Sequence, residues 1–251
     1  MSEDYILEAR GLTKQFRGFY AVKNVDLSVR RHSIHALIGP NGAGKTTCFN
    51  LLTTFLRATA GTIRFNGHSI EKSDPATVAR GGLVRSFQIS AVFGHMSVRE
   101  NVRVALQRKT GWNHSFWRSD GVLHGLDARA NELLAMVGLT RWAGHAANEL
   151  SYGRKRVLEL VTTIALEPEL ILLDEPVAGL GHEDIGPVME LIGRVAKGRT
   201  VLMVEHNMKV IEKLCNRVTV LQAGEKLAEG SYDEVARDPR VIEAYVGGSH
   251  A

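Results

Sequence analysis

The feature that most constrains this chain is a glycine-rich run at residues 39–47, Gly-Pro-Asn-Gly-Ala-Gly-Lys-Thr-Thr. Its pattern, G-x-x-x-x-G-K-[ST], leaves a series of backbone N–H groups pointing into one concavity that fits phosphate. Glycine allows the close approach and the positive φ values that such a concavity needs. Lys45 is expected to reach the β- and γ-phosphates of a nucleotide, and the Thr46 hydroxyl to ligate Mg²⁺. The predicted phosphate-binding residues are Gly39, Pro40, Asn41, Gly42, Ala43, Gly44, Lys45, Thr46 and Thr47.

The segments on either side of this loop favour the same interpretation. Residues 32–38 are typical of a strand that enters the loop, and residues 46–55 of a helix that leaves it. The N-terminus of that helix carries a partial positive charge, which would point at the bound phosphates. Strand, loop and helix together predict a nucleotide-binding site.

The composition is that of an ordinary globular protein and excludes several classes. The chain has 251 residues, of which 44% are hydrophobic and 23% are charged, so it can bury a sizeable core. Its start does not resemble a signal peptide, and no apolar run approaches the length of a membrane span. A protein of this kind that serves a membrane is expected to dock there through a partner.

Charge and cysteine content narrow the class further. The net charge of +4 is small, and the basic run at residues 154–156 is expected to be a solvated helix face, so we predict no nucleic-acid partner. Cys48 and Cys215 form neither a disulfide framework nor a zinc-ligand spacing. They are expected to be buried, reduced thiols in a cytosolic protein.

The pattern of apolar residues predicts an α/β fold. Apolar and polar residues alternate over residues 25–29, which indicates a half-buried strand, and residues 62–67 are typical of another strand closed by a turn. From residue 170 onward strand and helix alternate, which implies a parallel sheet covered by helices. The elements expected there are strands 170–173 and 200–204, helices 183–195 and 208–214, and a closing hairpin at 218–228.

Residues 92–166 interrupt that alternation, because apolar residues recur there at the spacing of one helix face. We therefore expect a single domain whose nucleotide-binding core covers about residues 1–91 and 167–251, with a helical block inserted at about 92–166. Three aromatic residues in the block either pack locally or form a contact surface for a partner. They are Trp112, Phe116 and Trp117.

Two strand ends are predicted to carry the catalytic groups. The apolar strand at Ile171 ends in Asp174 and Glu175, and acids at the carboxyl end of a buried parallel strand face the ligand crevice. Asp174 is expected to hold the Mg²⁺ shell, directly or through water, and Glu175 to orient and polarise the attacking water. His206 follows the next strand, so it should emerge at the same edge. A neutral imidazole there can hydrogen-bond the γ-phosphate and the attacking water.

A second helix start, in the run Leu150-Ser-Tyr-Gly-Arg154, is the other candidate anion site. Ser151 lies in a capping position, and Gly153 permits close backbone approach. This helix N-terminus could face a phosphate from the side opposite to the glycine-rich loop.

Together these motifs resemble those of ABC-transporter ATPase subunits, and the likeness runs over nearly all of the chain. Six motifs occur in the family's order. They are Phe16 as the aromatic that stacks adenine, residues 39–47 as the Walker A loop, Gln88 as the Q-loop glutamine, residues 150–154 as the signature, residues 170–174 as Walker B with its catalytic Glu175, and His206 as the switch histidine.

The resemblance implies a P-loop NTPase fold, with a RecA-like parallel-sheet core, an antiparallel β subdomain and an inserted α-helical subdomain. It also implies ATP and Mg²⁺ as cofactors. Lys45 and His206 would act with Glu175 in catalysis. Gln88 would join Thr46 and Asp174 at the metal.

Two positions depart from the family pattern. The usual signature L-S-G-G-Q is Leu-Ser-Tyr-Gly-Arg here, and the usual S-A-L-D after Walker B is Ala178-Gly-Leu-Gly181, which lacks the acid. Both motifs face the other subunit in the family's ATP-bound dimer, so homodimer and heterodimer stay open. Both departures, and the tail at residues 238–247, are similar to importers of branched-chain amino acids and related small polar solutes. The long stretch between Gln88 and Ser151 favours the larger ATPase of that subgroup.

The resemblance implies a head-to-tail dimer with a second ABC ATPase subunit, either a paralogue or a second copy, that sandwiches two ATP molecules. Closure would drive integral membrane permease subunits from the cytoplasmic face of the inner or plasma membrane. A periplasmic or extracellular solute-binding protein would take part indirectly. The alternatives are the ATPase of a lipid or lipopolysaccharide exporter and a soluble ABC protein that acts on ribosomes or DNA.

Overall fold

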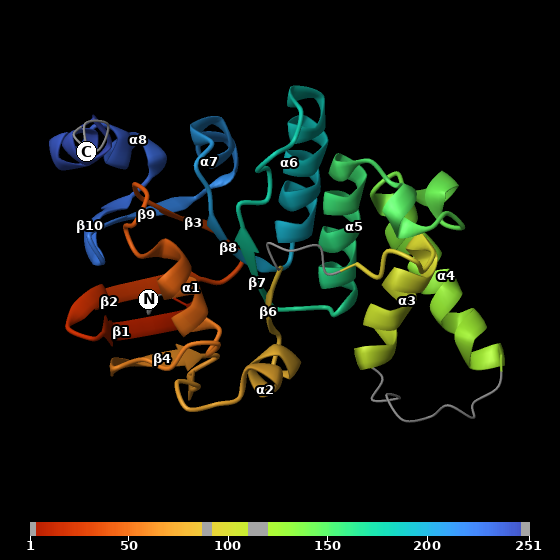
Figure 1. Ribbon diagram of the computed structural model, residues 1–251, viewed down its shortest axis with the longest axis horizontal. Coiled ribbons are helices and arrows are strands. Elements are labelled where there is room, and N and C mark those ends of the chain that lie inside the picture. The colour runs from red at the N-terminus through yellow and green to blue at the C-terminus, as the bar shows by residue number, and fades with distance from the viewer. Residues whose placement is uncertain (1–3, 87–91, 110–119, 247–251) are drawn as a thin grey trace. The chain divides into compact units, whose positions relative to one another are not determined.

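A computed structural model describes residues 4–86, 92–109 and 120–246, which divide into two compact units (Figure 1). The first unit comprises Met1–Arg85, Glu169–Val177 and Gly193–Ala251. The second comprises Ser86–Pro168 and Ala178–Ile192.

A six-stranded sheet, in the order β10-β9-β3-β8-β7-β6, is the centre of the first unit. Its strands are β3 (Ile34–Ile38), β6 (Leu83–Arg85), β7 (Leu170–Asp174), β8 (Thr200–Val204), β9 (Arg217–Gln222) and β10 (Glu225–Gly230). All neighbours are parallel except the hairpin β9–β10, which is antiparallel. Every residue of β3, β7 and β8 is buried, as continuous apolar runs require when both faces of a parallel sheet are covered.

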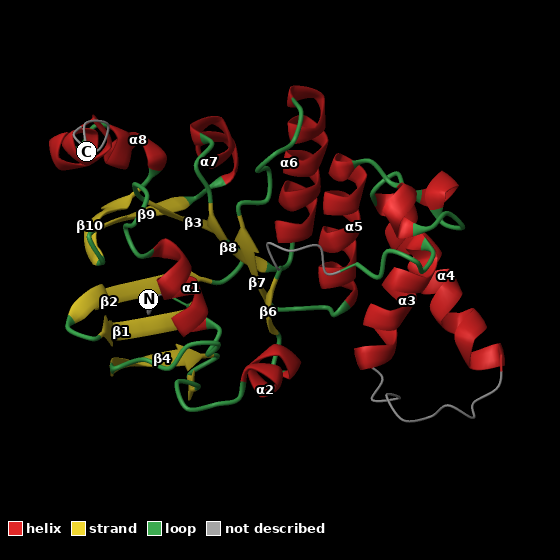
Figure 2. Ribbon diagram, viewed as in Figure 1, coloured by secondary structure: helices red, strands yellow, loops and turns green. Residues whose placement is uncertain are grey.

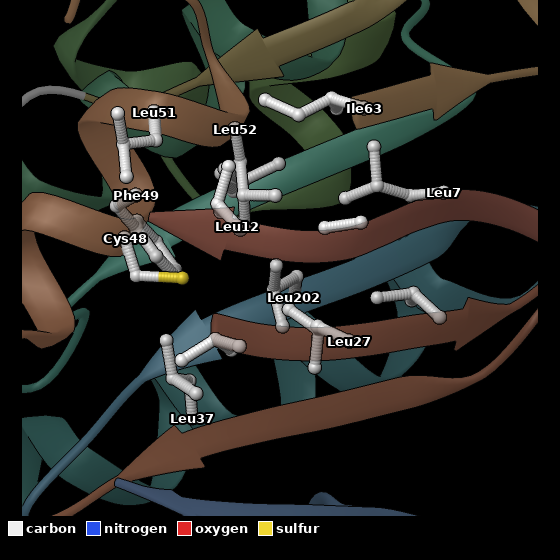
Figure 3. Packing of buried hydrophobic residues seen from close by; sticks show 14 of the residues in the cluster. Leu7, Leu12, Leu27, Leu37, Cys48, Phe49, Leu51, Leu52, Ile63 and Leu202 are labelled. Carbon is white, nitrogen blue, oxygen red and sulfur yellow. The ribbon is translucent and has the colours of Figure 1, made fainter. Parts of the chain in front are cut away.

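A four-stranded antiparallel sheet, in the order β2-β1-β4-β5, belongs to the same unit. Its strands are β1 (Tyr5–Phe16), β2 (Phe19–Arg30), β4 (Ala60–Phe65) and β5 (His68–Ser69). The core lies between the two sheets and helix α1 (Lys45–Leu52). Figure 3 shows its members, among them Leu7, Leu27, Leu37, Phe49 and Leu202. This core joins the antiparallel sheet to the strands that carry the candidate site.

Four further helices of the first unit are α2 (Pro75–Arg80), α7 (Met208–Leu214), α8 (Tyr232–Ala236) and α9 (Pro239–Val246). Three of these helices begin at a side chain that caps the helix N-terminus. The Asp74 side chain caps α2, the Asn207 side chain caps α7, and Ser231 with Glu234 forms a capping box on α8. No helix in the described part of the chain is long and apolar enough to cross a membrane.

The second unit is helical, as Figure 2 shows by its red ribbons. It contains α3 (Val98–Lys109), α4 (Asp120–Met136), α5 (Tyr152–Ala165), the start of α6 (His182–Ala196), and the 3₁₀ turns Thr140–Trp142 and Ala147–Glu149. Helix α3 packs against α4 and α5. Ser97 and Glu100 form reciprocal hydrogen bonds at the start of α3. The architecture confirms the predicted α/β class with parallel sheet, antiparallel sheet and helical subdomain.

Three local expectations differ from the structure. The helix expected to reach residue 55 ends at Leu52, because Thr54 adopts a left-handed φ of 59°. The basic run at 154–156 is not wholly solvated, since Arg156 is buried and pairs with Glu159 at 2.7 Å. Both cysteines are free, but only Cys48 is fully buried.

A buried histidine in β3 makes stability depend on pH. His35 is hydrogen-bonded through Nε2 to Thr219 Oγ1 at 2.8 Å, and burial lowers the pKa of His35 from 6.5 to about 4. Between pH 6.5 and pH 4 the unfolded chain therefore binds a proton that the folded chain does not, and stability falls as the pH falls.

We expect His35 alone to lower the free energy of unfolding by about 3 kcal/mol over that window. Chemical denaturation of wild type and of His35→Gln at pH 7 and pH 4.5 tests this. The variant should lose less stability than the wild type on acidification. Equal losses in the two proteins would contradict the assignment.

Candidate active site

Four parallel strands end at one edge of the large sheet, and the predicted phosphate-binding and catalytic residues of the first unit lie there. In the order β3, β8, β7, β6, neighbouring strands are hydrogen-bonded. The glycine-rich loop follows β3, His206 follows β8, and Asp174 ends β7. Arg85, which the sequence analysis did not single out, ends β6. The structure thus brings together Walker A, Walker B and the histidine, as expected for carboxyl ends of parallel strands.

The loop between β3 and α1 has the backbone of an anion-binding nest. Gly39, Gly42 and Gly44 have φ values of 148°, 79° and 97°. A Cβ on Gly39 would collide with the Leu221 carbonyl oxygen, and one on Gly44 with the Ala21 carbonyl oxygen. Glycine is therefore required at positions 39 and 44 by both conformation and close packing, and it is favoured at position 42 by conformation alone.

The Lys45 ammonium lies inside the loop. Its Nζ donates to the carbonyl oxygens of Gly39 at 2.7 Å and Pro40 at 2.9 Å. Burial lowers the pKa of Lys45, while the charges of Glu175 and Asp174 oppose that shift. The ammonium can exchange these two carbonyl acceptors for phosphate oxygens. Thr46, which is exposed, and Thr47 lie in the first turn of α1, whose N-terminus meets the loop.

The two carboxylates after the apolar run of β7 differ in environment. Asp174 is 1% exposed, and its Oδ2 accepts a hydrogen bond from Arg85 Nη2 at 2.6 Å. Glu175 is more exposed and has a left-handed φ of 47°. Its backbone N–H still donates to the Val204 carbonyl of β8 at 2.9 Å. The chain therefore turns at Glu175, so the two acidic side chains leave the backbone in different directions.

His206 and Glu175 meet across the β7–β8 pair. The His206 Nε2 atom lies 3.0 Å from Glu175 Oε1, which makes a carboxylate–imidazole pair at the sheet edge. An imidazole in this position can hold the carboxylate in place and relay a proton.

Glu205 is a positioning residue that the sequence analysis missed. It is 3% exposed, and its carboxylate accepts backbone N–H bonds from Val177 at 3.2 Å, His206 at 2.8 Å and Asn207 at 2.9 Å. It thereby joins the turn after Walker B to the turn that carries the histidine. The sequence does contain a signal for this residue, because Glu205 directly follows the apolar strand 200–204 and directly precedes His206.

Phe16, the predicted adenine platform, ends β1 and is 44% exposed. Lys14 Nζ lies 4.9 Å from the centroid of its ring. The ring is therefore accessible to a stacking base, and a cation sits beside it.

In the second unit, Ser151 is the N-cap residue of α5, as its expected capping position implies, and its side chain forms no capping hydrogen bond. The Asp184 carboxylate lies against Gly153, where an added Cβ would strike it. The Tyr152 hydroxyl donates to the Ala178 carbonyl at 3.3 Å. The Arg154 guanidinium lies 4.6 Å from the ring centroid of Trp142.

Four residues singled out in the sequence lie outside the described residues, namely Gln88, Trp112, Phe116 and Trp117. Among the described residues, no group of three or more His, Cys, Asp or Glu side chains could hold a metal by itself. The donor set at the loop instead fits Mg²⁺, which takes one or two protein oxygens and completes its shell with water and phosphate. Thr46 and Asp174 can supply those oxygens.

Comparisons with known proteins agree with this geometry. The family model described as "ABC transporter" matches residues 22–178. A second model, "Branched-chain amino acid ATP-binding cassette transporter", matches residues 225–251. The chain is 39% identical to the high-affinity branched-chain amino acid transport ATP-binding protein LivG of Salmonella typhimurium, and the match covers 96% of this chain and 98% of that protein.

Solved structures are similar over the same extent. The ADP conformation of an ATP-binding cassette of an ABC transporter is 27% identical with a TM-score of 0.83, and the match covers 97% of this chain and 99% of that one. A dimeric cassette in a post-hydrolysis state, bound to ADP and phosphate, is 25% identical with a TM-score of 0.77. That match covers 90% of this chain and 98% of the other.

We expect Glu205→Ala to lower the free energy of unfolding by about 3 kcal/mol, because three backbone N–H groups lose a charged acceptor. Urea denaturation measures this. The matched control is Glu212→Ala on α7, where the side chain is exposed, and it should change stability by about 0.5 kcal/mol or less. Equal effects of the two substitutions would rule out the bracing role of Glu205.

Proposed function

This chain belongs to the ABC transporter family of ATP-binding proteins and is an ATPase, and we propose that it energises an importer of branched-chain amino acids or related small polar solutes. The observation that supports this most is the end-to-end match to LivG, together with the family model over residues 225–251. That model covers the tail, outside the motifs that all ABC ATPases share. An ATPase of a lipid or lipopolysaccharide exporter is not favoured by these matches.

In the proposed mechanism the loop at residues 39–47 grips the phosphates of ATP, and the exposed ring of Phe16 stacks on the adenine. Lys45 leaves its carbonyl acceptors and neutralises the β- and γ-phosphates. Thr46, Asp174 and Gln88 would hold Mg²⁺, which would neutralise charge on the phosphate oxygens. Most of the catalysis then comes from positioning and electrostatics.

Glu175 is the proposed base that orients the attacking water, and His206 is its partner. The bond between them fixes the direction of the carboxylate, so the water can be aligned with the γ-phosphate. His206 is also the proposed sensor of whether that phosphate is present. Hydrolysis transfers the phosphoryl group to water and leaves ADP and phosphate.

Two chains are proposed to sandwich two ATP molecules head to tail. Ser151 and Gly153 of one subunit would face the nucleotide held by the other, with the N-terminus of α5 adding a second positive pole. The similar dimeric cassette bound to ADP and phosphate supports this arrangement. The partner subunit is a paralogue or a second copy of this chain.

The proposed location is the cytoplasmic face of the inner or plasma membrane, where the subunit is peripheral. Closure of the dimer would be transmitted to integral membrane permease subunits. Solute choice belongs to the permease and to a periplasmic or extracellular solute-binding protein, and the chain binds no nucleic acid.

Glu175→Gln should keep ATP binding but slow hydrolysis by about 100-fold or more, because the base is lost while the phosphate grip stays. The closed dimer should then accumulate, which size-exclusion chromatography with ATP detects. Glu243→Gln, an exposed acid on α9, is the control and should turn over normally. Wild-type turnover of Glu175→Gln would refute the role given to Glu175.

Cells that lack this subunit should lose uptake of labelled leucine, and re-expression should restore it. Urea and benzoate, tested in parallel, separate the related solute classes. Unchanged uptake of all three, with lipid or lipopolysaccharide exporter components co-purifying, would support the exporter alternative instead.

A further inference from the structure

We propose that Arg85 is a positioning residue of the ATPase reaction: it holds the Asp174 carboxylate in the orientation that serves the magnesium shell and ties it to helix α1. The inference rests on the proposed function in one respect, namely the role of Asp174 at the metal. No motif in the sequence analysis includes Arg85.

The backbone places Arg85 beside Walker B. It is the last residue of β6, whose parallel pairing aligns Arg85 with Leu172 of β7. Asp174 lies two residues further along β7, on the same edge of the sheet. Two strand ends from distant parts of the chain therefore present a cation and an anion to each other.

The side-chain contact is short and buried. Arg85 Nη2 lies 2.6 Å from Asp174 Oδ2, and the two side chains are 10% and 2% exposed. Arg85 Nη1 donates to the Asn50 side-chain oxygen on α1, and the guanidinium lies 5.7 Å from the Phe49 ring centroid. The guanidinium is thus held by an acid, an amide and an aromatic face. Its planar fork suits this arrangement, because two nitrogens of fixed geometry reach two acceptors at once.

The consequence for the metal follows from the carboxylate's two oxygens. Arg85 engages Oδ2 and so fixes the orientation of the carboxylate, which would serve the magnesium shell directly or through water. A carboxylate fixed at one oxygen presents the other in a constant direction. Groups that hold a metal-binding carboxylate in this way typically change metal affinity by about 10- to 100-fold when removed. Asn50 lies on α1, the helix that begins with Lys45 and Thr46. Arg85 therefore connects the Asp174 side chain to the helix that follows the phosphate-binding loop.

The test separates a positioning role from a brace of the fold. In Arg85→Gln, the half-saturating Mg²⁺ concentration for ATP hydrolysis should rise by about 10-fold or more. The affinity for Mn²⁺ of the protein–nucleotide complex, followed by electron paramagnetic resonance, should weaken by a similar factor. Binding of a fluorescent ATP analogue in EDTA should change by about 2-fold or less, because Arg85 contacts α1 at Phe49 and Asn50, beyond the phosphate-binding loop at residues 39–47.

The matched control is Arg31→Gln. Arg31 also forms a tertiary ion pair, with Asp4 at 2.9 Å and Glu169 at 3.4 Å, but it precedes β3 and so lies at the opposite strand ends. This control should leave the Mg²⁺ and Mn²⁺ dependence unchanged. If Arg85→Gln does not fold, Arg85→Lys and Asn50→Leu decide, because each keeps one of the two anchors. Both should then raise the half-saturating Mg²⁺ concentration, by less than the factor of about 10 expected for loss of both anchors.

A lowered melting temperature with unchanged Mg²⁺ and Mn²⁺ dependence would overturn the proposal and leave Arg85 a structural brace. The variant Asp174→Asn distinguishes the positioning role of Arg85 from the metal role of Asp174. If that variant raises the Mg²⁺ requirement and the Arg85 variants do not, only the role of Arg85 is wrong. If Asp174→Asn itself leaves the Mg²⁺ requirement unchanged, the proposed metal role of Asp174 is wrong.

Discussion

Parallel pairing of β3, β8, β7 and β6 is the constraint on which the candidate site depends. Because the four strands run in one direction, their carboxyl ends share an edge, and the loop at residues 39–47, His206, Asp174 and Arg85 meet there. A shift of one residue would turn the whole set of side chains to the other face. The continuous burial of β3, β7 and β8 therefore fixes the strand register and, with it, the positions of the site residues.

Much of this could be predicted from the sequence, because it is encoded locally. The loop is a contiguous pattern, and the apolar runs of β7 and β8 end in the polar residues that the site uses. The comparisons confirm the ABC ATPase resemblance that these motifs carried. Contacts between distant positions were not accessible: Arg85 and Asp174 are 89 residues apart, and Val177 and Glu205 are 28 residues apart. The burial of Arg156 had a local signal, since Glu159 follows three residues later.

The acids of the site are stabilised in three different ways, and this separates their chemistry. Asp174 is buried against a guanidinium, and Glu205 is buried against backbone N–H groups. Glu175 is more exposed than these two acids, and its carboxylate is hydrogen-bonded to the His206 imidazole. An acid hydrogen-bonded to a guanidinium or to backbone amides is held in a fixed orientation. The acid paired with a titratable ring is the one suited to proton transfer.

The Tyr152 side chain has a consequence for how this segment can change over evolution. Its ring packs on Gly179, where a Cβ would lie 3.3 Å from the ring, and its hydroxyl reaches the neighbouring Ala178 carbonyl. Gly179 also has a φ of 73°, which disfavours any replacement. A Cβ at position 179 would therefore both strain the backbone and press on the Tyr152 ring. A smaller side chain at position 152 would remove only the second obstacle, so the dependence between the two positions runs in one direction.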